Sequence, residues 1–538
     1  MTLMQIVSKK IWDKSIFIIL FYSFFVIHGE TVFNKISWWD DIVGCFAKPA
    51  FNESLPQGRW LYYIIESVLK RVAGVESLPV FNGIIVSACI GLFSLIVFSM
   101  FQIKDEKIKL SLGLIFLSIP SVAGHLGYRL DSGINFIGIL ICSVAAFISC
   151  RAICERRDLK KFLWGSFLFA CALGEYQCYF SLYLSICLLY FLNFLLSNDI
   201  SLKKYCKYIF CYVLNIALGL ILYLLILHIF LYFADVKLFS YANTNTYGIV
   251  SINEYLERIN YAYLIFLNPY LLSPANMFPF HWRGWYRLLI FFNALLTLFL
   301  MLTILRREEL KLLSNKNLLF QITLLLIIFP STLNFNGILY GWGNVHSLHA
   351  YQQCLLFLFP FIVFKALLKN LIELNISANM RGLYYSLICV LVVFGVLYIR
   401  YDNYCYMLSE IRQTQAIRYF TTLTTRIMSV DGYKNEMPVA FVHEEKKYNS
   451  IDDIKEFSDF PVTNPYYLPL IDVDKGYVEA IRAFMKYWCG YTPVFANSQI
   501  YESRDTVKLM PCYPDHGSIK IIDNVIVVKF SDNDRRIK

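Results

Sequence analysis

The sequence has little charge for its length. Only 16% of its 538 residues are Asp, Glu, Lys or Arg, whereas 57% are hydrophobic and 17% are aromatic. The mean hydropathy of +0.52 is far above what a soluble chain of this size needs to build a core. The composition therefore excludes an ordinary soluble protein and predicts a chain that lies in lipid.

The sequence also lacks the motifs of nucleotide chemistry. It contains no Walker loop, no dinucleotide-binding glycine pattern after a predicted strand and no nucleophile elbow, so nucleotide use has no support. It has no internal repeat and no low-complexity linker. The net charge of +10 does not indicate a nucleic-acid partner, because the basic residues lie in short clusters between apolar runs, where they act as topology signals.

Metal-ligand spacing is missing from the 15 cysteines, and we expect neither a metal nor a cofactor. Most of the cysteines lie inside apolar runs, where a cysteine is a small buried hydrophobe. Only Cys405, Cys489 and Cys512 fall in the polar tail, where an oxidising compartment would favour pairing Cys489 with Cys512. Examples of the buried kind are Cys89, Cys142, Cys171, Cys187 and Cys211.

Apolar runs of membrane-spanning length fill most of the chain before residue 400. A helix needs about 20 residues to cross the hydrocarbon core, which predicts about eleven spans. The first run follows a basic segment, but no small-x-small cleavage site comes after it, so we interpret it as a span rather than a signal peptide. Phe162–Leu196 is too long for one span and is divided at the polar cluster Gly174–Gln177. The predicted spans are Ser15–Ile27, Val80–Phe101, Leu110–Gly124, Ile134–Cys150, Phe162–Glu175, Tyr179–Leu196, Tyr208–Phe233, Tyr286–Leu305, Leu318–Phe335, Tyr351–Leu368 and Leu383–Ile399.

The distribution of Lys and Arg predicts the orientation. With the amino terminus in the cytoplasm, the basic clusters fall on the cytoplasmic side at nearly every loop, as the positive-inside rule requires. The opposite side then receives the longer segments, which are rich in Trp, Tyr, Asn and Gly and are where function usually resides. Those segments are Thr31–Pro79, His125–Gly133, Ala234–Trp285, Asn336–His349 and everything after Arg400.

The tail has the pattern of a small α/β domain. We therefore expect a membrane domain over residues 1–400 and an extracytoplasmic α/β domain over residues 401–538. The predicted elements of the tail are helices at Glu410–Met428 and Tyr477–Tyr487, a strand at Pro438–His443, and a hairpin in which Ile519–Ile522 turns at Asp523-Asn524 into Val525–Phe530.

Charged side chains gather in the first long loop on the non-cytoplasmic side. Asp40 and Asp41 are followed by Gly58, Arg59 and Trp60, so carboxylates and a guanidinium share one loop at the membrane face. A loop carboxylate there can act as general base toward a sugar hydroxyl within hydrogen-bond reach. The alternative is that the two acids cap a helix or form a solvated pair.

Two further polar groups lie at the same face. Arg129 and Asp131 follow the third span, where the fork of arginine donors suits a phosphate, unless the two residues form an interfacial anchor with an internal ion pair. Glu175, Tyr176 and Gln177 interrupt apolar sequence near a membrane boundary. An ionisable group is costly there unless it faces a cavity, although such a group can also simply end a helix at the interface.

Aromatic and imidazole side chains precede two later spans. His281 and Arg283 come before one, and Tyr340, His346 and His349 come before another. Such groups suit sugar binding, although aromatic residues also form the belts at membrane interfaces. The two later histidines are three positions apart but have no third partner at ligand spacing, so no metal site is predicted.

The order of these groups resembles a known family. Asp40-Asp41, Gly58-Arg59-Trp60, Arg129-x-Asp131 and Glu175-Tyr176-Gln177 make the membrane region similar to the serotype-converting O-antigen glucosyltransferases, the family called glucosyl transferase type II. The resemblance implies a GT-C-like, α-helical polytopic transferase that moves glucose from undecaprenyl-phosphate glucose to lipid-linked O-antigen on the periplasmic face of the bacterial inner membrane. In that class the usual base is an acid of the first external loop, which falls here on Asp40 or Asp41.

The expected reaction is a single inverting displacement. The carboxylate removes a proton from the acceptor hydroxyl as the hydroxyl attacks the anomeric carbon, and polyprenyl phosphate leaves. Arg59 or Arg129 would stabilise the charge on the departing phosphate. The other expected substrate-binding residues are Trp60, Asp131, Glu175, Tyr176, Gln177, His281, Arg283, His346 and His349.

Two other functions stay open at this point. A flippase or transporter for lipid-linked sugars would also need many spans and a polar cavity, but it would place its charges at mid-membrane rather than at the external ends of spans. An O-antigen polymerase also handles lipid-linked glycans and is the nearer alternative.

Overall fold

A bundle of long apolar helices makes up most of the molecule. The computed structural model describes residues 14–34, 54–73, 79–128, 131–156, 158–198, 200–239, 249–267, 316–341, 347–369, 378–442 and 478–532. Nine helical segments within these ranges are long and apolar enough to cross a membrane, so the chain is a membrane protein. The helices of the bundle are α2 (Lys14–Phe33), α5 (Pro79–Met100), α6 (Glu106–Ser118), α7 (Pro120–Gly127), α8 (Ser132–Arg151), α9 (Leu159–Glu175), α10 (Tyr179–Ser197), α11 (Leu202–Ala234), α14 (Lys316–Leu333), α16 (Phe359–Lys369) and α17 (Ala378–Met428).

Three predicted spans correspond to candidate membrane spans of the structure, but their residues are divided between two helices. Apolar runs predict length and burial, but they do not reveal where backbone groups change hydrogen-bond partners. The predicted span Tyr286–Leu305 lies outside the described residues. The divided spans are Leu110–Gly124, which forms α6 and α7, Leu318–Phe335, which forms α14 and the start of α15 (Phe335–Tyr340), and Tyr351–Leu368, which begins within the 3-10 helix η8 (Ser347–Phe357) and continues as α16.

Pro120 separates α6 from α7. Proline has no N–H, so it cannot bond the carbonyl of Phe116 one turn earlier. The Tyr351 hydroxyl donates to the Phe116 carbonyl (3.2 Å), and Nε2 of His28 donates to the Leu117 carbonyl (2.9 Å). Side chains of η8 and α2 therefore satisfy backbone groups that a break inside the bundle would otherwise leave unpaired.

The junction between α14 and η8 is stabilised in the same way. The Leu333 carbonyl accepts hydrogen bonds from the Ser181 hydroxyl (2.9 Å) and the Gln352 amide (2.9 Å). The Asn336 amide donates to the carbonyl of His349 (2.8 Å), which joins α15 to η8. This network fixes the backbone of His349 beside the bundle.

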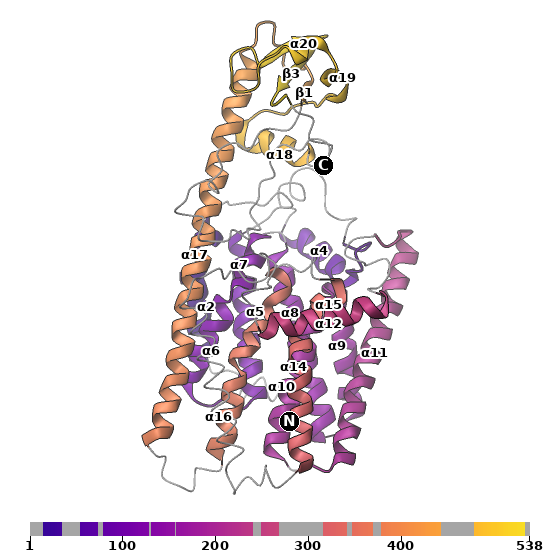
Figure 1. The fold of residues 1–538 in the computed structure, drawn as a ribbon, viewed down its shortest axis with the longest axis vertical. Coiled ribbons are helices and arrows are strands. Elements are labelled where there is room, and N and C mark those ends of the chain that lie inside the picture. The colour runs from indigo at the N-terminus through magenta and orange to yellow at the C-terminus, as the bar shows by residue number, and fades with distance from the viewer. Residues whose placement is uncertain are drawn as a thin grey trace.

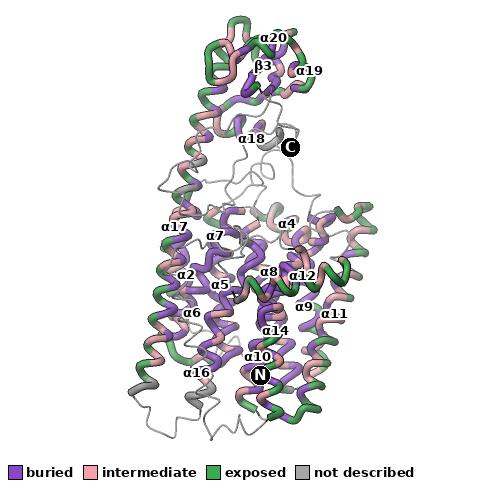
Figure 2. Tube along the Cα trace, viewed as in Figure 1, coloured by how far each residue is buried: buried purple, intermediate pink, exposed green. Residues whose placement is uncertain are grey.

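Two helices beside the bundle are treated separately from the spans. They are α4 (Trp60–Ala73) and α12 (Ile252–Leu267), and α12 runs across the bundle axis (Figure 1). The end of the bundle that carries α4 and α7 is called the α4 end below. Buried residues run through the centre of the bundle, whereas exposed ones follow α12 and the outer sides of α11 and α17 (Figure 2).

The longest helix joins the bundle to a small sheet. α17 has 51 residues, and its far end carries β1 (Val439–Val442), β2 (Ile519–Ile522) and β3 (Val525–Lys529), well beyond the α4 end (Figure 1). The strand order is β1-β3-β2, with β1 parallel and β2 antiparallel to β3. Around the sheet lie α18 (Val478–Cys489), α19 (Gln499–Glu502) and α20 (Asp505–Lys508).

The predicted hairpin is confirmed, but other details of the tail differ. Asp523 and Asn524 have φ values of 48° and 63°, the left-handed pair that a two-residue turn between β2 and β3 requires. The predicted helix Glu410–Met428 is not separate, because it continues the last span within α17. No disulfide joins Cys489 to Cys512, so the favoured pairing is wrong, and the Cys489 sulfur instead lies 3.7 Å from the Thr421 hydroxyl.

Candidate active site

A tight turn presents Arg59 at the start of α4. The Gly58 amide donates to the Leu55 carbonyl (2.9 Å), and the Arg59 amide donates to the Ser54 carbonyl (3.0 Å). Gly58 has a φ of +83°, a conformation that L-residues adopt only with strain. The turn therefore depends on glycine at this position.

Side chains from two spans fasten this turn. The Gln177 amide donates to the Gln57 carbonyl (2.9 Å) and to the Tyr223 hydroxyl (3.0 Å), and that hydroxyl donates to the Gly58 carbonyl (3.1 Å). A Cβ at Gly58 would lie 2.6 Å from the Gln177 amide nitrogen and 2.8 Å from the Tyr223 oxygen. Gln177 thus positions the loop that holds Arg59.

Arg59 is a half-buried cation beside an aromatic ring. Its guanidinium carbon lies 3.9 Å from the centroid of the Tyr176 ring, a cation–π contact. Its Nε is buried and has no hydrogen-bond partner among the described residues. Burial by itself lowers the pKa of the guanidinium, but the surrounding Tyr176, Asp131 and Glu175 raise that pKa above its usual value. Arg59 therefore keeps its charge while this donor stays unused.

Asp131 lies next to this cation, just before α8. It accepts a hydrogen bond from the Tyr62 hydroxyl of α4. Burial raises the pKa of Tyr62 well above its usual value, and the charge of Asp131 raises it further, so the phenol keeps its proton and acts as a donor. Tyr62 follows Arg59 by three positions, and α4 consequently turns both side chains toward Asp131.

Glu175, the last residue of α9, is fully buried. Its Oε2 lies only 1.9 Å from where a Cβ on Gly138 of α8 would stand, so the bare backbone of Gly138 makes room for it. The nearby Tyr179 hydroxyl donates to the Asn135 carbonyl (2.7 Å), and neither Glu175 oxygen has a hydrogen-bond partner among the described residues. Burial favours the neutral acid over the carboxylate at this position, and the charge of Arg59 acts in the opposite direction without outweighing burial.

Tyr176 joins this cluster to η8. Its hydroxyl lies 2.6 Å from Nε2 of His349, and the Tyr340 ring stacks on the imidazole at 5.4 Å between centroids and an interplanar angle of 27°. His349 is also held through its carbonyl, which accepts hydrogen bonds from the Asn336 and Gln352 amides at 2.8 Å each. The Tyr176 ring is therefore fixed beneath the Arg59 guanidinium.

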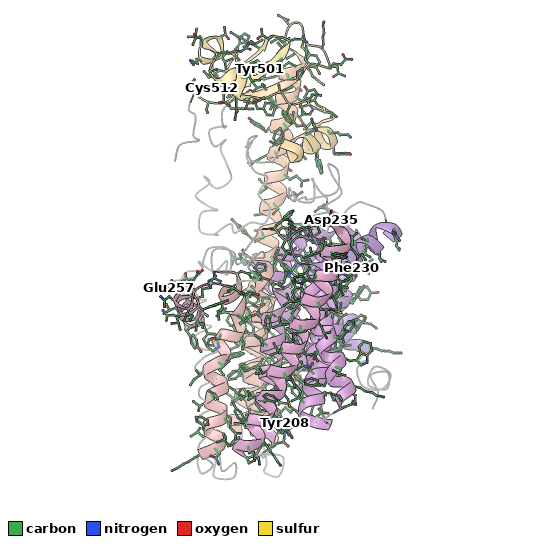
Figure 3. All side chains as sticks on the ribbon, turned by 90° about the vertical axis from the view of Figure 1, so that its right-hand side faces the viewer. Tyr208, Phe230, Asp235, Glu257, Tyr501 and Cys512 are labelled. Atoms are coloured by element: carbon green, nitrogen blue, oxygen red, sulfur yellow. The ribbon has the colours of Figure 1, made fainter. Side chains whose placement is uncertain are left out.

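Trp60 packs inside the bundle. Its ring stacks on Phe230 of α11, with 6.0 Å between the ring centroids. Phe230 lies near the α4 end of that helix (Figure 3). A Cβ on Gly174 would come within 2.3 Å of the indole, so the glycine lets α9 and α4 approach closely. The structure thus surrounds Trp60 with apolar contacts.

The structure brings most of the predicted site residues that it describes into one cluster. Asp131, Glu175 and Tyr176 surround Arg59, His349 contacts Tyr176, and Gln177 fastens the preceding turn. The indole of Trp60 packs against neighbouring helices. The predicted residues that lie outside the described ranges are Asp40, Asp41, Arg129, His281, Arg283 and His346.

Sequence reasoning missed three contributors. Tyr62 could have been predicted from the sequence, since the spacing of Arg59, Tyr62 and Glu66 places all three on one side of a helix. Gly138 and Gly174 could not have been predicted, because only the folded structure reveals which side chain approaches a glycine.

The arrangement suits an anionic ligand. A charged guanidinium that lies over an aromatic ring and has an Nε without a hydrogen-bond partner among the described residues is a donor group suited to an anion such as a phosphate. Its surroundings are buried, so charge interactions there are stronger than in water.

The sequence matches a known family model. The model for glucosyl transferase GtrII aligns with residues 29–345, more than half of the 538 residues. The aligned range includes Arg59, Asp131, Glu175, Tyr176 and Gln177 and ends before His349. No curated protein and no solved structure matches the chain.

Proposed function

The chain belongs to the glucosyl transferase GtrII family and is a glucosyltransferase, and we propose that it moves glucose from undecaprenyl-phosphate glucose to lipid-linked O-antigen. The transfer takes place on the periplasmic face of the bacterial inner membrane, with the amino terminus in the cytoplasm and residues 401–538 in the periplasm. The charge clusters of the sequence support this orientation.

The observation that carries the proposal is the state of Arg59. It is charged and partly buried, it stacks on Tyr176, and its Nε has no hydrogen-bond partner among the described residues. A phosphate that gains charge as the glucosyl bond breaks would be stabilised by such a group more strongly than the intact donor is. Arg129, which precedes Asp131, is a second candidate for this role.

Asp40 and Asp41 are the candidates for the base. They belong to the segment between α2 and the turn that begins at Ser54, so the chain that carries them leads directly into the turn that presents Arg59. One carboxylate takes the proton of the acceptor hydroxyl while the hydroxyl oxygen bonds to the anomeric carbon and the bond to the donor phosphate breaks. Asp131 already accepts a hydrogen bond from Tyr62, and Glu175 is fully buried, so we assign base catalysis to the loop acids.

The remaining predicted residues are assigned to substrate contact and positioning. Gln177 and Trp60 hold α4 and its preceding turn, and Tyr176 with His349 supports the guanidinium. We assign His281, Arg283 and His346 to the acceptor glycan, because their imidazole and guanidinium donors suit sugar hydroxyls.

The test measures transfer of radiolabelled glucose in membranes that contain the protein, polyprenyl-phosphate glucose and an O-antigen acceptor. We expect transfer by the wild type and loss of most of it in either Asp40→Asn or Asp41→Asn, whichever removes the base. Normal transfer by both variants would contradict the base assignment. A wild type that transfers no glucose but moves lipid-linked glycans across the bilayer would contradict the proposed reaction.

A further inference from the structure

α12 is a helix with three different sides. It crosses the bundle axis, and its labelled residue Glu257 stands at the edge of the molecule, away from the spans (Figures 1 and 3). A helix in this position contacts the bundle along only part of its surface, so its exposed side chains indicate what surrounds the rest.

The first side faces the protein. Arg258 is buried and donates to the carbonyls of Ile338 and Leu339, both at 3.0 Å, at the end of α15. Ala262, one turn later, is fully buried, and its carbonyl accepts a hydrogen bond from the Asn334 amide (3.0 Å). A cation placed on the last carbonyls of a helix is stabilising, so this side fastens α12 to α15.

The second side is exposed and polar. Asn253, Glu257 and Asn260 are exposed, and their spacing of four and three residues places them in one stripe. Such a stripe suits water.

The third side is exposed and apolar. Ile252 is 78% exposed, Leu256 60% and Ile259 36%, and with the half-buried Tyr263 they form a second stripe at the same helical spacing. A run of exposed aliphatic side chains beside a polar stripe is costly in water.

The apolar stripe is continuous with the outer side of a span. The Tyr263 hydroxyl donates to the carbonyl of Ile327 in α14 (2.6 Å). Ile327 itself is 55% exposed, and Phe320 on the same helix is 58% exposed. Exposed apolar residues along a membrane-spanning helix face lipid, so the stripe of α12 opens onto the same surroundings.

We propose that α12 is a membrane-surface helix whose stripe Ile252, Leu256, Ile259 and Tyr263 lies among the acyl chains of the leaflet at the α4 end. The polar stripe faces water, and the Arg258 side holds α15. Because α15 carries Tyr340, which stacks on His349, the leaflet and the candidate active site are linked through one hydrogen-bonded helix pair. This inference concerns lipid contact and does not depend on the reaction.

Photo-crosslinking distinguishes the two exposed stripes. Benzoylphenylalanine replaces Leu256 or, as a matched control one position away, Glu257, in full-length protein in membranes whose phospholipids carry radiolabelled acyl chains. After irradiation, we expect several-fold more label on the protein altered at Leu256. A second pair, Ile252 and Asn253, should give the same difference.

Both members of each pair are exposed, so the new ring displaces no packed neighbour. The amount of protein in the membrane fraction and its Tm show whether each variant has folded. Equal lipid labelling at the two members of a pair would overturn the proposal. So would a crosslink from Leu256 to another protein in place of lipid.

Discussion

Gly138→Ala perturbs the candidate site without changing any charged or hydrogen-bonding group. The new Cβ would lie 1.9 Å from Oε2 of Glu175 and 2.6 Å from a ring carbon of Tyr179. Both neighbours belong to packed helices, and Glu175 is fully buried. The carboxyl group of Glu175 therefore has to move, which changes its interaction with Arg59.

The size of the effect follows from these distances. Ordinary contact needs about 3.4 Å, so Oε2 must shift by about 1.5 Å if the backbones stay in place. Overpacking of this kind typically costs about 1–3 kcal/mol. Displacement of Arg59 is expected to reduce its stabilisation of the transition state by about 1.4–2.8 kcal/mol. The rate of glucose transfer then falls about tenfold to a hundredfold.

The assay compares Tm and the rate of glucose transfer for purified Gly138→Ala and a matched control. Gly382→Ala is the control, because a Cβ at Gly382 of α17 meets nothing within 4 Å. We expect the control to keep its rate and to keep or slightly raise its Tm, because alanine favours a helix more than glycine does. In a Glu175→Ala background, Gly138→Ala should cost less stability than in the wild type, because the clashing carboxylate is gone. If Gly138→Ala and Gly382→Ala behave alike, the close contact between α8 and Glu175 does not exist as described.

Three further changes test other contacts. Tyr62→Phe removes the donor to Asp131 and should cost about 1–3 kcal/mol of unfolding free energy, measured by denaturant titration, and an unchanged midpoint would argue against the hydrogen bond. Gly58→Ala should lower the Tm and glucose transfer together, since its φ of +83° and its 2.6 Å approach to Gln177 both oppose a side chain, and a fully active variant would refute the need for glycine. Arg258→Gln should speed hydrogen exchange and proteolysis in α12 while the spans stay protected. Unchanged protection of α12 would show that the hydrogen bonds from Arg258 to α15 are not needed to hold it.

The sequence predicts the positions of most of the candidate spans among the described residues, because length and apolarity define them. The turn residues of the tail also predicted where two strands end and begin. Asp523 and Asn524 tolerate the left-handed backbone that the hairpin turn needs. Helix breaks were missed because their stability comes from distant side chains. The carbonyls around Pro120, for example, are satisfied by His28 and Tyr351.

The sequence predicted the charged residues of the candidate site but not the residues that position them. Arg59 and Glu175 stood out because ionisable groups are rare in apolar sequence near a membrane boundary. The positions of these two side chains relative to each other could not be predicted. They depend on Gly138 and on the Tyr176–His349 hydrogen bond, which involve residues far apart in the chain. The continuity of α17 was missed because the change from apolar to polar composition near Arg400 looks the same whether a helix ends or leaves the membrane.

The most direct test of phosphate binding by Arg59 is the affinity of the purified protein for undecaprenyl-phosphate glucose. Arg59→Gln is compared with Arg71→Gln, which removes an exposed cation from α4, the helix that follows Arg59. Charge-assisted hydrogen bonds contribute about 1.5–3 kcal/mol, so we expect Arg59→Gln to raise the Kd about tenfold to a hundredfold and Arg71→Gln to leave it unchanged. Equal Kd values for the wild type and both variants would contradict phosphate binding by Arg59.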